Sequence, residues 1–66
     1  MNALQIAEMN RNLAIALYNA ALSAHAQQQW DEKLKAAVEL AAEIYQAADE
    51  AVQEAPGYME QFSKGD

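Results

Sequence analysis

The sequence contains no cysteine, and its two glycines and one proline all lie within the last 11 residues. Without cysteine the chain has neither a disulfide framework nor a thiolate zinc site. Residues 1–55 contain no strong helix breaker, and sixteen of the 66 residues are alanine. With 53% hydrophobic residues the chain is too apolar for a disordered tail. The composition therefore predicts a small all-α domain spanning residues 1–66.

Basic side chains are also scarce, with four Lys and Arg against ten Asp and Glu, a formal charge of −6. An independent nucleic-acid binder needs a basic footprint, so the charge argues against direct binding to nucleic acid. The single histidine, His25, has Ser23 two residues away, which points elsewhere on a helix. No Glu-x-x-His motif is present, although glutamates recur at i, i+4 spacing. We therefore expect no enzyme activity, no metal and no cofactor.

One stretch resembles a targeting signal, because residues 12–30 contain no Asp, Glu, Lys or Arg. Within it, residues 13–22 are apolar apart from Asn19. A secretory signal begins with a positive region, whereas here Glu8 accompanies Arg11. A membrane span needs about 20 mostly apolar residues, and several amide side chains interrupt this run. We expect a buried helix, no membrane partner and a cytoplasmic location.

The second half of the chain has the pattern of an amphipathic helix over about residues 31–55. Its apolar side gathers Trp30, Leu34, Ala37, Val38, Leu40, Ala41, Ile44, Tyr45, Ala48, Ala51, Val52 and Ala55. Asp31 and Glu32 suit the first turn, and Pro56-Gly57 marks the end. The polar side includes an acidic face of Glu39, Glu43, Glu50 and Glu54.

The first half predicts a helix over about residues 3–26 with two apolar sides. One side contains Ile6, Met9, Leu13, Ala16, Leu17, Ala20 and Ala24. The nearly opposite side contains Leu4, Ile15, Tyr18 and Leu22, and Arg11 lies at the same angle. A helix with two apolar sides needs two partners. We expect the second helix of the chain to cover one side, and another molecule to cover the other.

The connection between the helices has two interpretations. Apolar residues follow heptad spacing from residue 6 to residue 55 except at Ser23 and Gln27, which one continuous coiled-coil helix would satisfy. The alternative is an antiparallel hairpin with a turn at about residues 27–30. The two halves match in length, and the heptad pattern fails where a turn would lie. We therefore predict the hairpin, followed by a tail of residues 56–66.

A hairpin this small buries little apolar surface, so two copies are expected to form a four-helix bundle. Leu4, Arg11, Ile15, Tyr18 and Leu22 are then assigned to the dimer seam or to a docking surface, because arginine and tyrosine within an apolar patch are typical of interfaces. The alternative for Arg11 is an ion pair with Glu8 or with an acid of the second helix. In length and topology this resembles the Rop family of plasmid copy-control hairpins. No motif matches that family, and the charge argues against its RNA-binding activity.

The tail provides a second candidate docking segment, formed by Tyr58, Met59 and Phe62. Spacing i, i+1, i+4 allows one helical turn, which either caps the bundle or docks on another protein. The leading functional hypothesis is a small homodimeric module that binds and inhibits another protein, as phage and mobile-element antagonists of host regulators do. The partner is expected to present a basic surface. The alternatives are a structural part of a larger assembly and an acidic mimic of nucleic acid.

Overall fold

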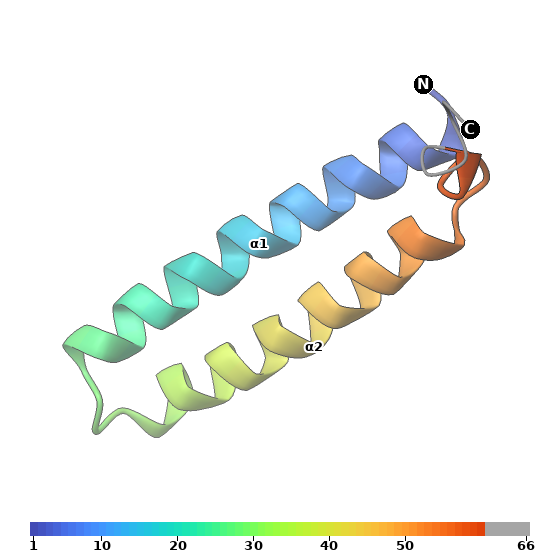
Figure 1. The fold of residues 1–66 in the computed structure, drawn as a ribbon. Helices are drawn as coiled ribbons and strands as arrows, with labels where there is room; N and C mark the ends of the chain where they lie inside the picture. The colour runs from blue at the N-terminus through green and yellow to red at the C-terminus, as the bar shows by residue number, and fades with distance from the viewer. Residues whose placement is uncertain (61–66) are drawn as a thin grey trace.

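The computed structural model describes residues 1–60, which form two helices packed side by side (Figure 1). Helix α1 spans Ala3–Gln27 and helix α2 spans Glu32–Glu54. The helices are antiparallel, with the turn at one end and the start of α1 and the end of α2 at the other (Figure 1). The molecule is 51 Å long and 20 by 15 Å across. The predicted all-α hairpin is confirmed, and the single continuous helix is excluded.

Both helices begin at a capping side chain. Asn2 Oδ1 accepts a hydrogen bond from the Gln5 amide at 2.8 Å, and Gln5 Oε1 accepts one from the Asn2 amide at 3.0 Å. At α2, Asp31 Oδ1 accepts from the amides of Lys33 at 2.8 Å and Leu34 at 3.3 Å. These bonds satisfy amides that have no partner within the helix, so each cap fixes where its helix starts.

The chain reverses direction between Gln27 and Glu32 without a glycine. The Gln28 amide donates to the carbonyl oxygens of Ala24 and His25, and the Asp31 amide donates to Gln28 O at 3.0 Å. At the other end, α2 stops before Pro56, and Gly57 adopts a φ of +93° that L side chains rarely adopt. A bonded turn and a glycine bend therefore delimit α2.

The seam between the helices is narrow and consists of small side chains. Among the described residues the buried ones are Ala7, Ala14, Ala41 and Val52, between 1% and 9% exposed. Small side chains let helix axes approach closely, but each buries little apolar area. The hairpin alone therefore has a thin core, and most of its large apolar side chains lie outside it.

The structure exchanges the two apolar sides of α1 relative to our expectation. Leu4, Ile15 and Tyr18 lie half-buried on the side that faces α2, and Arg11 lies among them. Ile6, Met9, Leu13 and Leu17, which we expected against α2, are 48–68% exposed. The physical reason is the size of the residues at the seam, because Ala7 and Ala14 let α2 approach on their side.

Candidate functional site

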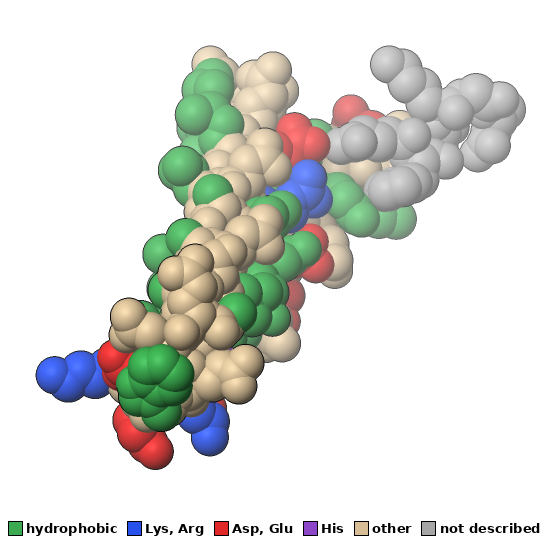
Figure 2. Space-filling model, turned by 90° about the vertical axis from the view of Figure 1, so that its left-hand side faces the viewer, with side chains coloured by type: hydrophobic (Ala, Val, Ile, Leu, Met, Phe, Trp, Pro, Cys, Tyr) green, Lys and Arg blue, Asp and Glu red, His purple; other side chains and the backbone are tan. Residues whose placement is uncertain are grey.

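Large apolar side chains form an exposed surface on one face of the hairpin. This surface, called the outward face here, consists of Ile6, Met9, Leu13 and Leu17 of α1 with Leu40 and Ile44 of α2, between 41% and 68% exposed. The α1 residues of the outward face form one row along their helix, and the α2 residues form a second row. At 100° per residue, each row lies roughly a quarter to a third of a turn from the side of its helix that faces the other helix. Because the helices are antiparallel, both rows fall on the same side of the hairpin. Figure 2 shows hydrophobic side chains following one another along the left-hand edge of the molecule.

The register of the two helices follows from three contacts across the seam. Tyr18 lies beside Tyr45, and Arg11 beside Asp49. A side chain built on Gly57 would lie 3.8 Å from Leu4. Positions on the two helices whose residue numbers add up to about 60–63 therefore lie level with each other.

Bulk is distributed unevenly over the outward face. On α1 the bulky residues run from the open end to the middle, and the row continues toward the turn with Ala20 and Ala24. On α2 the bulky residues lie at the middle and toward the turn, and the row continues toward the open end with Ala47 and Ala51. At three levels of the face a large side chain on one helix therefore has an alanine beside it on the other: Met9 beside Ala51, Leu13 beside Ala47 and Leu40 beside Ala20. At the middle of the face Leu17 and Ile44, both large, lie level with each other.

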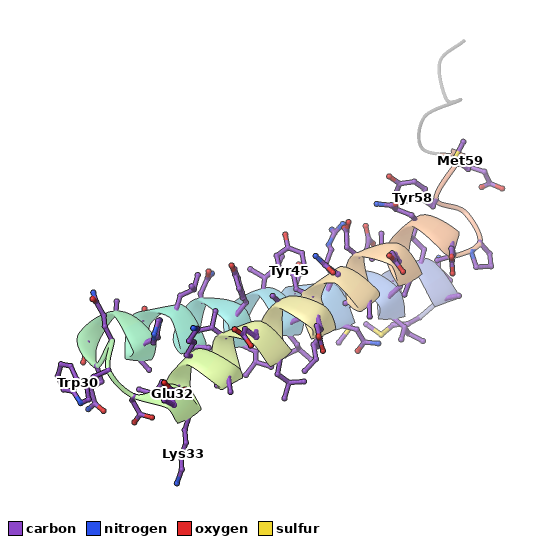
Figure 3. All side chains as sticks on the ribbon, turned by 90° about the horizontal axis from the view of Figure 1, so that it is seen from below. Trp30, Glu32, Lys33, Tyr45, Tyr58 and Met59 are labelled. Atoms are coloured by element: carbon purple, nitrogen blue, oxygen red, sulfur yellow. The ribbon has the colours of Figure 1, made fainter. Side chains whose placement is uncertain are left out.

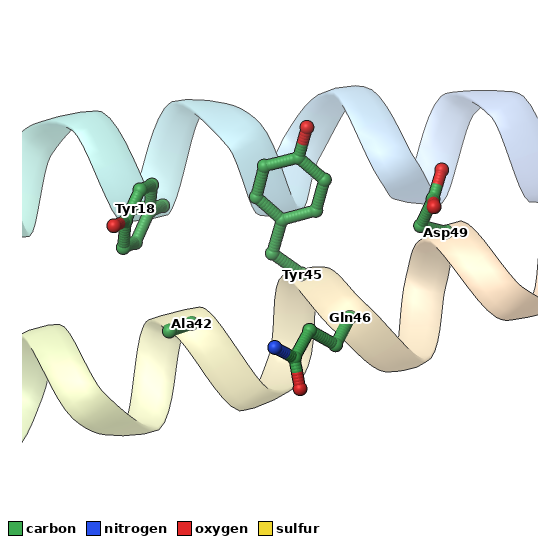
Figure 4. A pocket seen from close by; sticks show the side chains of 5 residues that line it. All are labelled: Tyr18, Ala42, Tyr45, Gln46 and Asp49. Atoms are coloured by element: carbon green, nitrogen blue, oxygen red, sulfur yellow. The ribbon is translucent and has the colours of Figure 1, made fainter.

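The opposite face contains a shallow pocket between the helices. This tyrosine pocket has a volume of about 350 Å³ and is lined by Tyr18, Ala42, Tyr45, Gln46 and Asp49. The two tyrosine rings are 6.0 Å apart between centroids and inclined at 70°, an edge-to-face pair. Figure 4 shows the Tyr45 ring between Tyr18 and Asp49, and Figure 3 shows Tyr45 projecting from the upper side of the hairpin. Ring faces beside a carboxylate suit a cationic or aromatic group of a partner.

One charged pair joins the helices beside this pocket. Arg11 Nη1 lies 3.9 Å from Asp49 Oδ1, and the side chains are 31% and 43% exposed. Asp49 Oδ2 also accepts a hydrogen bond from Gln53 Nε2 at 3.1 Å. At this distance and exposure the ion pair contributes little to stability. Because both side chains are partly exposed, their charged groups are accessible to a partner.

The structure brings most of the predicted docking residues to this opposite face. Arg11 and Tyr18 line or flank the tyrosine pocket through their contacts with α2. Leu4 and Ile15 are half-buried, and Leu22 is 39% exposed. Their predicted role in binding a partner stays a prediction.

The other predicted surfaces lie apart from the pocket. Glu39, Glu43, Glu50 and Glu54 are all exposed along α2. In the tail, Tyr58 is half-buried and Met59 is 71% exposed, whereas Phe62 lies outside the described residues. Figure 3 shows Met59 at the open end and Trp30, 80% exposed, at the turn.

The partner of Tyr18, Tyr45 of α2, was not predicted from the sequence. For Arg11, pairing with an acid of the second helix was one of two interpretations, and the acid is Asp49. A signal was present, because Leu4, Arg11, Tyr18 and His25 repeat every seven residues and mark a second heptad stripe on α1. Arg11 in that stripe is opposite in charge to Asp49 on α2. The apolar side with larger residues appeared the better core, but it faces outward.

Within residues 1–60, no three His, Asp or Glu side chains gather where they could hold a metal ion. Neither α1 nor α2 is long and apolar enough to cross a lipid bilayer. Comparison with protein-family models, with curated proteins and with solved structures finds no match to this chain.

Proposed function

We propose that this chain is a non-enzymatic protein-binding module, which dimerises through its outward face and binds and inhibits another protein through the tyrosine pocket. The observation that carries the proposal is the outward face itself. Its six large apolar residues are 41–68% exposed, whereas the seam between the helices buries three alanines and one valine among the described residues. An apolar surface that extends over both helices is typical of an interface.

The occupant of the outward face is a second copy of the chain, because the face is complementary to itself. A two-fold axis lying in the face brings the bulky half of each row onto an alanine half of the other copy. Large side chains then fill the space above small ones, as a well-packed bundle core requires. The product is a four-helix bundle whose core is larger than that of the hairpin.

Dimerisation through the outward face leaves the tyrosine pocket free for a different protein. Arginine and tyrosine are enriched among the residues that dominate the binding energy of interfaces. Here Tyr18 and Tyr45 line the pocket, and Arg11 flanks it through its ion pair with Asp49. The acidic face of α2 adds a field that attracts a basic surface, which increases the association rate more than the affinity. The pocket therefore provides the specific contacts, and the acids bring the partner close.

Partner binding is tested by capture from an extract of the cell that encodes the chain. The immobilised wild-type chain should retain one partner at a fixed ratio, and Tyr18→Ala or Arg11→Ala should weaken retention by about 5- to 150-fold, the range of interface hot spots. Tyr58→Ala is the matched control, because it removes a tyrosine outside the pocket. Equal capture by both pocket variants would contradict the assignment, and loss only in Tyr58→Ala would move the site to the tail.

The alternative of an assembly component predicts a different dependence on concentration. A regulator forms a discrete dimer, whereas a scaffold forms larger species as its concentration increases. Sedimentation velocity over a hundredfold concentration range should show one dimeric species. A steady shift toward larger particles would favour the assembly component.

A further inference from the structure

The proposed homodimer can form in two ways, and the distribution of charge distinguishes them. This inference rests on the proposed function. With the two-fold axis parallel to the helices, α1 of each copy lies on α2 of the other and both turns lie at the same end; we call this the aligned arrangement. With the axis across the helices, α1 lies on α1, α2 lies on α2 and the turns lie at opposite ends, the opposed arrangement. Both arrangements place the bulky part of each row on the alanine part of a row in the other copy, so side-chain size does not decide between them.

Of the two helices, α2 carries most of the charge. This helix carries six acidic and two basic side chains, a net charge of −4. Helix α1 carries one of each, Glu8 and Arg11, and both are half-buried. The two helices therefore differ strongly as neighbours across a seam.

The acids of α2 border the outward face. Glu43 lies three residues after Leu40, and Glu50 and Glu54 lie three residues after Ala47 and Ala51. Residues three apart are neighbours on a helix surface, so these carboxylates line the outer edge of the α2 row. The corresponding edge of the α1 row contains Asn2, Gln5, Ala16 and Ser23, all uncharged.

These edges meet in different combinations in the two arrangements. In the opposed arrangement the acidic edges of two α2 helices run along the same seam, within roughly one Debye length of each other at physiological salt. In the aligned arrangement each acidic edge borders the uncharged edge of an α1 helix. Like-charge contacts disfavour the wrong pairing in helical assemblies.

We propose that two copies pack in the aligned arrangement, with α1 of each on α2 of the other and both turns at the same end of the bundle. The two exposed indoles of Trp30 then lie at one end of the bundle, and the start of each α1 and the end of each α2 lie at the other. Every helix in this bundle is antiparallel to its two nearest neighbours. The two tyrosine pockets lie on opposite outer faces.

The absence of cysteine allows a direct test with one nitroxide label per chain. Gln29→Cys places the label on an exposed position in the turn, away from the outward face. Pulsed electron spin resonance should give a distance within about 30 Å between the two labels, because neighbouring helices in a bundle lie roughly 8–10 Å apart. A distance close to the 51 Å length of the hairpin would overturn the aligned arrangement.

A label at the open end provides the matched control. Gln53→Cys should also give a short distance, and a mixture of the two labelled chains should add a long one only in the aligned arrangement. The opposed arrangement predicts the reverse, with a short distance appearing only in the mixture. Light scattering on the same samples separates the two proposals. A dimer with long label distances overturns the orientation alone, and a monomer without dipolar coupling overturns the homodimer itself.

Discussion

The smallest residues of the chain determine which side of α1 meets α2. Ala7, Ala14 and Ala41 are at most 9% exposed, so the closest approach of the helices occurs at positions that bury little area. The larger residues of the seam, Tyr18 and Tyr45, lie at its edge and retain partial exposure. The edge-to-face contact of their rings is therefore an important specific contact of the hairpin.

Replacing one ring of this pair should measure that contact. Tyr18→Leu retains an apolar side chain but removes the ring, and we expect the free energy of unfolding to decrease by about 0.5–1.5 kcal/mol, the typical value of an aromatic pair beyond its buried area. Tyr18→Phe, which keeps the ring, should unfold close to the wild type. Urea titration followed by circular dichroism provides the measurement. Identical midpoints for Leu and wild type would show that the rings do not contact each other in solution.

At the scale of the helices, the capping residues determine the two ends of the turn. Asp31 accepts two amide hydrogen bonds at the start of α2, and its negative charge also interacts favourably with the positive end of the helix dipole. Asp31→Ala should therefore lower the free energy of unfolding by about 1 kcal/mol. Asp31→Asn keeps the accepting oxygen and should recover most of the loss in a urea titration. If Ala and Asn unfold alike, the hydrogen bonds of the cap contribute nothing.

The two sides of α1 provide a matched pair of leucine substitutions. Leu13 is 68% exposed on the outward face, and Leu22 is 39% exposed on the other side. Leu13→Gln should weaken dimerisation at least about tenfold, because burying a leucine contributes ~1.5–3 kcal/mol. Leu22→Gln should leave the dimer intact. The thermal midpoint should increase with concentration for wild type and Leu22→Gln, and much less for Leu13→Gln. The opposite ranking would place the dimer interface on the side that contains Tyr18.

At the scale of the whole molecule, the fold was predictable because local signals agreed with one another. Periodicity at 3.6 residues, an acid at residue 31 and the Pro56-Gly57 pair all indicate two helices and a turn. The hairpin and not the continuous helix formed because residues 23–29 break the heptad pattern with polar side chains. These signals depend only on residues close to one another in the sequence, so they can be recognised without knowing how the helices pack.

The candidate site was predictable only in its residue types. Two apolar sides on α1 are evident in the sequence, but the side that faces α2 depends on how closely the helices approach. Ala7 and Ala14 allow that approach, whereas Leu13 and Leu17 on the bulkier side do not. The pairing of Tyr18 with Tyr45 requires the register of two segments 27 residues apart. Such a register follows from packing in three dimensions and not from periodicity.

The thin seam of the hairpin and its exposed outward face both favour a homodimer. The most direct test is the mass of the intact chain by static light scattering at micromolar concentration, with circular dichroism on the same sample. We predict twice the chain mass of 7.3 kDa and full helicity. A fully helical species with the mass of a single chain would contradict the homodimer, because the outward face would then be stable in water without a second copy.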